Sequence, residues 1–196
     1  GTIGDIGTLS FFPSKNLGAM GDGGMCLTND DELAARLRQL RVHGENPKYY
    51  HKWVGLNSRL DTIQAAVLVK KLPHLEKWSE ARRKNAEYYY QNLKDVPQIK
   101  LPVIIENATS IYNQFTLLAE NRDELLEYFR SQNIGCAVYY PKPLHLQECF
   151  AEFGYKQGDF PVSEVTAKKV IAIPIFSEIT KEQQDFVIQT IKEFYQ

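Results

Sequence analysis

The chain has 196 residues, of which 43% are hydrophobic and 24% charged, and its formal net charge is −1 at pH 7. This composition is typical of a soluble globular protein of one or two domains, and it gives no electrostatic reason to expect a nucleic-acid or membrane partner. No apolar run approaches the roughly 18 residues that a membrane helix needs. The three cysteines Cys26, Cys136 and Cys149 lack the spacing of metal ligands, so we expect reduced thiols, a cytoplasmic protein and no metal site.

The first residues of the chain already belong to a predicted sheet. Apolar side chains predict a short buried strand over residues 8–12 and a neighbouring strand over residues 25–28. The loop between them contains Lys15 and four closely spaced glycines, which are typical of tight turns. Because a strand follows so soon after Gly1 and no methionine precedes it, we expect the chain to be a piece of a longer protein.

Two helices and a loop are predicted next. Asn29, followed three residues later by a glutamate, is typical of a capping box at the start of a helix that ends near Gly44. Residues 45–54 contain a proline and several aromatic side chains without a period, which indicates a loop whose rings pack against another surface. Ser58 is predicted to cap the second helix and Pro73 to end it.

A long amphipathic helix is predicted over residues 74–93, and we place a domain boundary near its start. Residues 1–74 then form the first domain and residues 75–196 the second, with the long helix bridging them. The second domain alternates strands (residues 113–119, 136–140 and 170–175) with helices (residues 122–132, residues 162–169 and a last helix that a capping box at Thr180 begins). This pattern predicts a small α+β domain in which helices cover one face of a sheet.

Three segments carry a family resemblance. The segment from Ser10 to Gly24, S-F-F-P-S-K-N-L-G-A-M-G-D-G-G, resembles the pyridoxal-phosphate lysine segment of the DegT/DnrJ/EryC1/StrS family of nucleotide-sugar aminotransferases. Residues 54–68 and 139–147 resemble two further blocks of that family, in the expected order. The resemblance implies an α/β protein with the fold type I of pyridoxal-phosphate transferases. This chain would be the C-terminal part of the large domain together with the small domain.

Lys15 is the candidate catalytic residue. A primary amine can form a Schiff base with the aldehyde of pyridoxal 5'-phosphate, and once displaced by substrate it can carry protons. The resemblance implies that Lys15 does both, with pyridoxamine phosphate as the intermediate form of the cofactor. By local chemistry alone, a solvated lysine beside a glycine turn is the structural alternative. The residues that stack on and protonate the cofactor ring are expected upstream of Gly1.

The resemblance also implies two residues that bind the cofactor phosphate. Ser10 would donate to it from a strand end, and Asn57 would reach it across a dimer interface, so we expect a homodimer with shared active sites. The alternatives are a serine bonded to its own backbone and an asparagine that only caps a helix.

Four further residues are candidates for binding the nucleotide-linked sugar: His43, Arg59, Tyr140 and His145. An arginine fork and imidazolium donors suit a sugar diphosphate. The structural alternatives are a charge at a helix C-terminus for His43, an ion pair with Asp61 or another carboxylate for Arg59, packing for Tyr140 and a turn hydrogen bond for His145.

These assignments imply an aminotransferase that moves an amino group from an L-amino acid, with glutamate expected, to a keto sugar linked to a nucleotide. The product would serve polysaccharide, lipopolysaccharide or glycosylated metabolites. The block R-L-D-T-I-Q-A-A at residues 59–66 and the loop K-Y-Y-H at residues 48–51 look most like members that act on 3-keto sugars. The family's dehydratase branch has a histidine in place of the lysine, so Lys15 argues against that alternative. A non-catalytic regulatory remnant of the fold is the third interpretation, and the upstream sequence would distinguish it.

Overall fold

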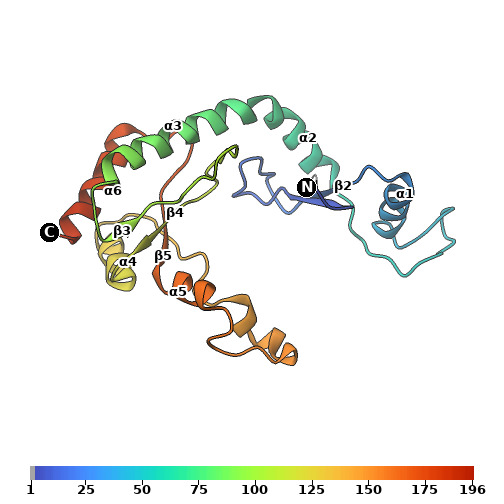
Figure 1. Cartoon of the computed structure of the whole chain (residues 1–196). Coiled ribbons are helices and arrows are strands. Elements are labelled where there is room, and N and C mark those ends of the chain that lie inside the picture. Colours follow the sequence, from blue (N-terminus) through green and yellow to red (C-terminus); the bar gives the residue numbers. More distant parts are fainter. Residues whose placement is uncertain (1–2) are drawn as a thin grey trace. The chain divides into compact units, whose positions relative to one another are not determined.

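The computed structural model describes residues 3–196 and is drawn in Figure 1. Its contacts divide the chain into two compact units, Gly1–Glu76 and Lys77–Gln196. The predicted domain boundary, between residues 74 and 75, lies two residues before this division. Each unit contains its own antiparallel sheet.

The sheet of the first unit is a ribbon of β1 (Gly7–Ser10) and β2 (Gly24–Leu27), with Thr8 opposite Cys26. The two strands lie close to where the sequence predicted them, but the prediction that the first is buried was wrong. A two-stranded ribbon has no second layer to cover its faces, and most of its side chains are exposed here.

The first helix, α1 (Asp31–Leu40), is capped by Asp30 rather than by Asn29. The Asp30 carboxylate accepts a hydrogen bond from the N–H of Leu33 at 2.9 Å. Thr28 supports this register, because its hydroxyl oxygen accepts from the N–H of Asp30 at 3.1 Å. A carboxylate also interacts favourably with the positive end of the helix dipole, which a neutral asparagine does not.

The second helix, α2 (Thr62–Lys71), follows Asp61, so the prediction that Ser58 caps it was wrong. The backbone N–H of Ser58 donates instead to the carbonyl of Arg41, just beyond the end of α1, at 2.9 Å. Ser58 is therefore held beside the end of α1 and does not cap α2.

Pro73 lies where α2 ends, as predicted, but the chain stays helical. It passes through one 3-10 turn, η1 (Leu72–His74), directly into the long helix α3 (Leu75–Leu93). Proline is tolerated there because the first turn of a helix does not use its N–H. The side chains of Tyr89 and Leu93 on α3 are fully buried, which makes this helix part of the core of the second unit.

The sheet of the second unit has the order β3-β4-β5 and is antiparallel throughout. Its strands are β3 (Ile99–Lys100), β4 (Phe115–Ala119) and β5 (Val170–Ile173). β4 alternates between buried and half-buried residues, as expected for a strand with one face on the core. All four residues of β5 are buried, so both of its faces are covered.

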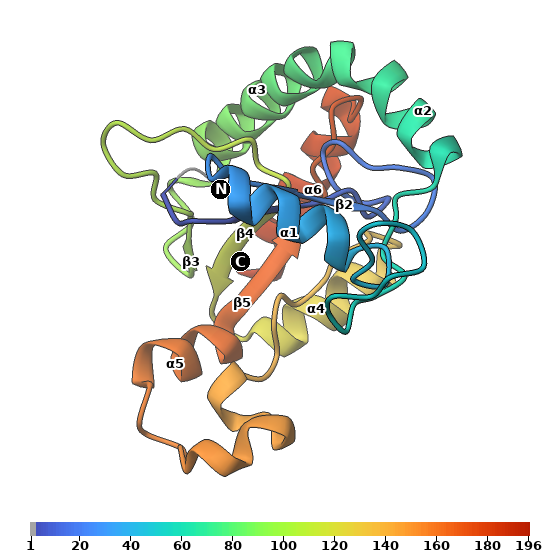
Figure 2. The same cartoon turned by 90° about the vertical axis from the view of Figure 1, so that its right-hand side faces the viewer.

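Helices α4 (Arg122–Ser131) and α6 (Lys181–Phe194) join α3 around this sheet (Figure 1). The largest fully buried side chains of the core are Tyr89, Phe115, Phe129, Leu93, Leu117, Leu125, Ile171 and Ile191. The remaining elements are the 3-10 helices η2 (Leu144–Leu146) and η3 (Glu148–Phe153) and the helix α5 (Pro161–Lys169), which extend away from α3 and α6 (Figure 2).

Two predictions for the second unit have opposite outcomes. The strand predicted over residues 136–140 is reduced to one bridge, between Ala137 and Ala172, because the next residues turn to solvent and Tyr140 is 72% exposed. The capping box of the last helix is confirmed. The Thr180 hydroxyl accepts from the N–H of Gln183 at 3.2 Å, and the Gln183 side chain accepts from the N–H of Thr180 at 3.0 Å.

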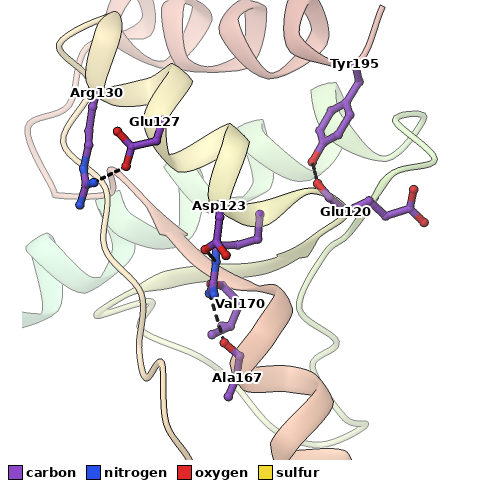
Figure 3. Close-up of polar contacts among 8 residues, drawn as sticks. Glu120, Asp123, Glu127, Arg130, Ala167, Val170 and Tyr195 are labelled. Atoms are coloured by element: carbon purple, nitrogen blue, oxygen red, sulfur yellow. Dashed lines mark hydrogen bonds and ion pairs between the residues drawn. The ribbon is translucent and has the colours of Figure 1, made fainter.

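Arg122 at the start of α4 ties three elements of the second unit together. Its partners Asp123, Ala167 and Val170 are labelled in Figure 3. Its side chain is 8% exposed and pairs with the exposed carboxylate of Asp123 at 2.6 Å. One guanidinium nitrogen donates to the carbonyls of Ala167 at 3.2 Å and Val170 at 2.8 Å, where α5 meets β5. A guanidinium suits this position because its planar donors can serve several acceptors at once.

The three cysteines are free thiols in this structure. Among residues 3–196, no cluster of histidine, cysteine and acidic side chains could hold a metal ion. Within the same range, no helix is both long and apolar enough to cross a membrane.

Candidate functional site

Lys15 lies on the tip of a loop that its own backbone closes. We call residues 11–23 the lysine loop. Phe11 closes its base: its N–H donates to the carbonyl of Gly23 at 2.8 Å, and its carbonyl accepts from the N–H of Ala19 at 2.8 Å. Within the loop, the N–H of Lys15 donates to the carbonyl of Phe12 at 2.9 Å, and the lysine side chain is exposed. The amine is therefore presented to its surroundings from a turn fixed at its base.

Gly18 makes the tightest turn of the lysine loop possible. A Cβ atom at this position would lie 2.4 Å from the carbonyl oxygen of Pro13, which is far inside van der Waals contact. Only glycine lets the backbone pass this close. At this position of the glycine cluster, a glycine is therefore required for steric reasons.

Helix α2 packs against the lysine loop and bonds to it. Gln64 accepts a hydrogen bond from the N–H of Met20 at 2.9 Å, and the ammonium group of Lys71 donates to the carbonyl of Gly18. Leu68 packs with Phe11 in the small core of the first unit. No prediction from the sequence assigned Gln64 or Lys71 to the site, although Gln64, Leu68 and Lys71 share one helical face at spacings of four and three.

Ser10 precedes the lysine loop and is exposed. Its hydroxyl oxygen accepts a hydrogen bond from the N–H of Phe12 at 3.3 Å. This contact is the one expected if Ser10 only bonds to the backbone of its own segment. A hydroxyl that accepts a backbone N–H still has its own proton to donate, so the contact is compatible with binding a phosphate oxygen.

Asn57 lies beside the end of α1 rather than at the start of a helix. It pairs with Val42 in an antiparallel bridge, and the N–H of His43 donates to the carbonyl of Leu56 at 2.9 Å. Because Asp61 is the N-cap of α2, the alternative in which Asn57 only caps that helix is wrong. The bridge brings the backbones of Asn57 and His43 next to each other.

His43 and Gly44 turn the chain sharply after α1, with φ angles of 64° and 72°. A Cβ atom on Gly44 would lie 2.0 Å from the carbonyl oxygen of Trp53, so the loop returns directly over this turn. The side chain of His43 is exposed, and its carbonyl oxygen lies 3.0 Å from Nδ1 of His51. His43 is thus held by its backbone and leaves its imidazole at the surface.

Arg59 follows the bridge and is exposed. In the part of the chain that the structure describes, no ion pair joins it to Asp61 or to another carboxylate, so the structural alternative for Arg59 is not observed. The first unit therefore presents two sets of predicted site residues: Ser10 with Lys15 around the lysine loop, and His43 with Asn57 and Arg59 around the bridge.

The remaining two candidates belong to the second unit and differ in exposure. Tyr140 is 72% exposed, with its ring 5.5 Å from that of Tyr139. The side chain of His145 is only 8% exposed, its Nε2 lies 3.0 Å from Glu164 on α5, and its ring centroid lies 4.7 Å from that of Phe160. These contacts hold the segment before α5 onto that helix. Substrate binding by His145 stays a prediction that they do not support.

Glu164 is the centre of this contact. Its carboxylate accepts the N–H of Gly158 at 2.8 Å and that of Phe160 at 3.4 Å. The hydrogen bond from Gly158, together with that from His145, holds the pKa of Glu164 below its usual value.

The comparisons with known proteins bear on the family and the fold of the chain. Residues 1–192 match the model of the DegT/DnrJ/EryC1/StrS aminotransferase family. The pleiotropic regulatory protein of Geobacillus stearothermophilus is 49% identical over all of this chain and 53% of its own length. UDP-N-acetyl-3-dehydro-alpha-D-glucosamine 3-aminotransferase of Acidithiobacillus ferrooxidans is 42% identical over 93% of this chain and 49% of its own.

A solved structure shows which fold the chain has. The crystal structure of DesV from S. venezuelae, in complex with a ketimine intermediate, superposes with a TM-score of 0.93 at 39% identity. It covers 98% of this chain and 52% of DesV. The chain thus spans about half the length of the relatives that it matches. Its mixed α/β fold is the one found in the corresponding half of these aminotransferases, and the chain belongs to the DegT/DnrJ/EryC1/StrS aminotransferase family.

Proposed function

We propose that the protein containing this chain is a pyridoxal-phosphate aminotransferase that acts on a keto sugar linked to a nucleotide. The observation that carries this proposal is the presentation of Lys15. Its exposed amine stands on a turn fixed at the base by Phe11, in a chain that belongs to an aminotransferase family.

The residues of the first unit fit the cofactor chemically. Ser10 offers a hydroxyl proton and Asn57 an amide N–H, and both side chains are exposed, as donors to a phosphate must be. Lys15 would hold the cofactor covalently through Nζ and would carry a proton on the same nitrogen once the substrate had released it. The bound cofactor supplies the electron sink that transamination needs.

The names of the relatives narrow the substrate class. Among them are a UDP-3-dehydro-sugar 3-aminotransferase, a dTDP-3-amino-sugar transaminase 39% identical to this chain, and a UDP-3-oxo-glucuronate aminotransferase 41% identical. We therefore propose a 3-keto sugar nucleotide as acceptor and glutamate as donor. His43, Arg59 and Tyr140, which the structure leaves exposed, are the candidates for contacting the acceptor.

The proposal includes the assembly and the cellular setting. The protein would be a cytoplasmic homodimer in which Asn57 of one subunit serves the cofactor of the other, and its product would enter polysaccharide or glycosylated metabolites. Residues 1–74 and 75–196 would be the end of the large domain and the small domain.

Borohydride reduction of the full-length holoenzyme tests the proposal. We expect a cofactor adduct on the peptide containing Lys15, no adduct in Lys15→Ala, and amine transfer to at least one member of a panel of 3-keto sugar nucleotides. A holoenzyme labelled elsewhere than at Lys15 would overturn it.

A regulatory role is the second candidate, because two relatives carry regulatory names. They are the 49% identical pleiotropic regulatory protein and the 44% identical erythromycin biosynthesis sensory transduction protein EryC1 of Saccharopolyspora erythraea. The same experiment separates the candidates: a regulator without catalysis would show no transfer to any keto sugar.

A further inference from the structure

We propose that one face of α2 is a cradle for the lysine loop, and that Gln64 and Lys71 are positioning residues that set where the Lys15 amine stands. The cradle is defined as Gln64, Leu68 and Lys71 on α2 together with Leu60, which precedes the helix. This inference rests on the proposed function, because it takes Lys15 as the group that holds the cofactor.

The cradle follows from helical spacing. Gln64, Leu68 and Lys71 are separated by four and three residues and so lie on one side of α2. Leu60, four residues before Gln64, continues this line just before the helix begins. Two of the members are polar, on a face that packs against a small apolar core, and both make contacts to backbone atoms of the lysine loop.

Gln64 holds the side of the loop that returns to β2. Its Oε1 accepts the N–H of Met20 at 2.9 Å. A Cβ atom on Gly21 would lie 3.0 Å from Nε2 of the same amide, so the glycine leaves room for the glutamine to approach. The amide group thus fits a space that the loop sequence leaves open for it.

Lys71 holds the tightest turn of the loop. Its ammonium group donates to the carbonyl of Gly18, the residue whose missing Cβ lets the chain pass over Pro13. Lys71 is half-buried, whereas its neighbour Lys70 is exposed. Gly18 lies only three residues after Lys15, so a shift of this carbonyl moves the turn that presents the amine.

Leu60 and Leu68 complete the cradle with apolar contacts. A Cβ on Gly23 would lie 2.9 Å from a methyl group of Leu60, and Leu68 is 7% exposed beside Phe11 and Ala19. The cradle therefore holds the lysine loop at three places: its base at Phe11, its tight turn at Gly18 and the segment at Met20 that leads back to β2. A geometry error of about 1 Å at a reacting group costs up to about a hundredfold in rate, so this support bears on catalysis as well as on stability.

The same helix also connects the two sets of predicted site residues. Asn57 and Arg59 lie just before Leu60, where the cradle begins. The backbone of Asn57 is fixed by its bridge to Val42, and α2 follows within a few residues. A displacement of α2 would therefore move the lysine loop and the predicted phosphate ligand together.

The test uses the full-length holoenzyme and two pairs of variants. Gln64→Ala removes the acceptor for Met20, whereas Gln64→Glu keeps an oxygen in the same place. Lys71→Ala removes the ammonium group, and Lys70→Ala is the matched control with an exposed lysine on the adjacent position. Hydrogen exchange of the lysine loop, the fraction of enzyme trapped by borohydride, kcat and KM are measured for each.

We expect Gln64→Ala to raise the exchange rate of the Met20 amide about tenfold or more, because that amide loses its acceptor. Trapping and kcat should fall about tenfold, with KM for the keto sugar within about twofold. Gln64→Glu should restore most of the protection, Lys71→Ala should resemble Gln64→Ala, and Lys70→Ala should resemble the parent enzyme.

Two outcomes would overturn the inference. One is unchanged exchange and trapping in both Gln64→Ala and Lys71→Ala, and the other is equal effects of Lys71→Ala and Lys70→Ala. Lys15→Ala keeps the two proposals apart. If this variant still traps cofactor, the proposed function fails, whereas normal trapping in the cradle variants with none in Lys15→Ala overturns the cradle alone.

Discussion

Gln64 and Met20 are joined by a hydrogen bond of 2.9 Å across 44 positions of the chain. The bond links the middle of α2 to the backbone of the lysine loop, five residues after Lys15. It shows that the loop is a supported structure and that its support comes from the segment that also follows Asn57 and Arg59. Substitutions in α2 are therefore expected to act on the position of Lys15 without touching its side chain.

The first prediction concerns the turn at Gly18. We expect Gly18→Ala to lower the free energy of unfolding by about 1–3 kcal/mol, because its Cβ would lie 2.4 Å from the carbonyl oxygen of Pro13. The displaced loop should also reduce cofactor trapping at Lys15. Gly135→Ala is the control, since no atom lies within 4 Å of its added Cβ. Thermal unfolding and borohydride trapping check both, and equal stability of the two variants would contradict the steric argument.

The second prediction separates the two candidate caps of α1. Asp30→Ala should lower the free energy of unfolding by about 1 kcal/mol, because the N–H of Leu33 loses its acceptor at 2.9 Å. Asn29→Ala should change it by less than about 0.5 kcal/mol. Urea unfolding of the two variants measures the difference, and the reverse order would restore Asn29 as the cap.

The third prediction compares two arginines of α4, Arg122 and Arg130, of which Figure 3 labels Arg130 beside Glu127. Arg122→Ala should destabilise the protein by about 2–4 kcal/mol, because the carbonyls of Ala167 and Val170 lose a buried donor. Arg130 pairs with Glu127 at the surface, where both side chains are more than half exposed. Arg130→Ala should therefore cost less than about 1 kcal/mol. Similar losses for both variants, by denaturant titration, would refute the assignment of Arg122 as a buried tie.

The fourth prediction concerns pH. Hydrogen bonds hold the pKa of Glu164 below its ordinary value of 4.5, and the ionised form is therefore the one that stabilises the fold. The contribution is complete above the ordinary pKa and is lost as the pH falls through the lowered pKa of the folded state. Glu164→Gln should thus have a lower Tm than the parent at neutral pH, and the gap should close in acid. A gap that widens below pH 4.5 would show the opposite sign of shift.

Local patterns in the sequence were sufficient where neighbouring residues decide the structure. The capping box at Thr180 involves Gln183 only three residues away, and both of its hydrogen bonds are present. The long helix before Leu93 was also placed correctly, because its period extends over many residues. The amino-acid sequence of the segment around Lys15 was enough to identify the family.

Other features depend on contacts between residues far apart, and there the sequence predictions failed. Residues 136–140 were expected to be a strand, but pairing needs a partner, and within residues 3–196 it is limited to one bridge, between Ala137 and Ala172. Ser58 has the chemistry of a helix cap, yet its backbone is taken by Arg41. His145 is a different case: the structure buries it against Glu164, and its predicted role in binding the substrate stays a prediction.

The amino-acid sequence by itself determined the family and most of the helices, and it made Lys15 the candidate reactive amine, because each depends on residue types at short spacing. Only the tertiary structure decided how Lys15 is held. The support comes from Gln64 and Lys71, which are more than 40 positions away and bind backbone atoms rather than side chains. Nearly every residue has the same backbone N–H and carbonyl groups, so the sequence of the lysine loop could not predict which distant side chains bind them.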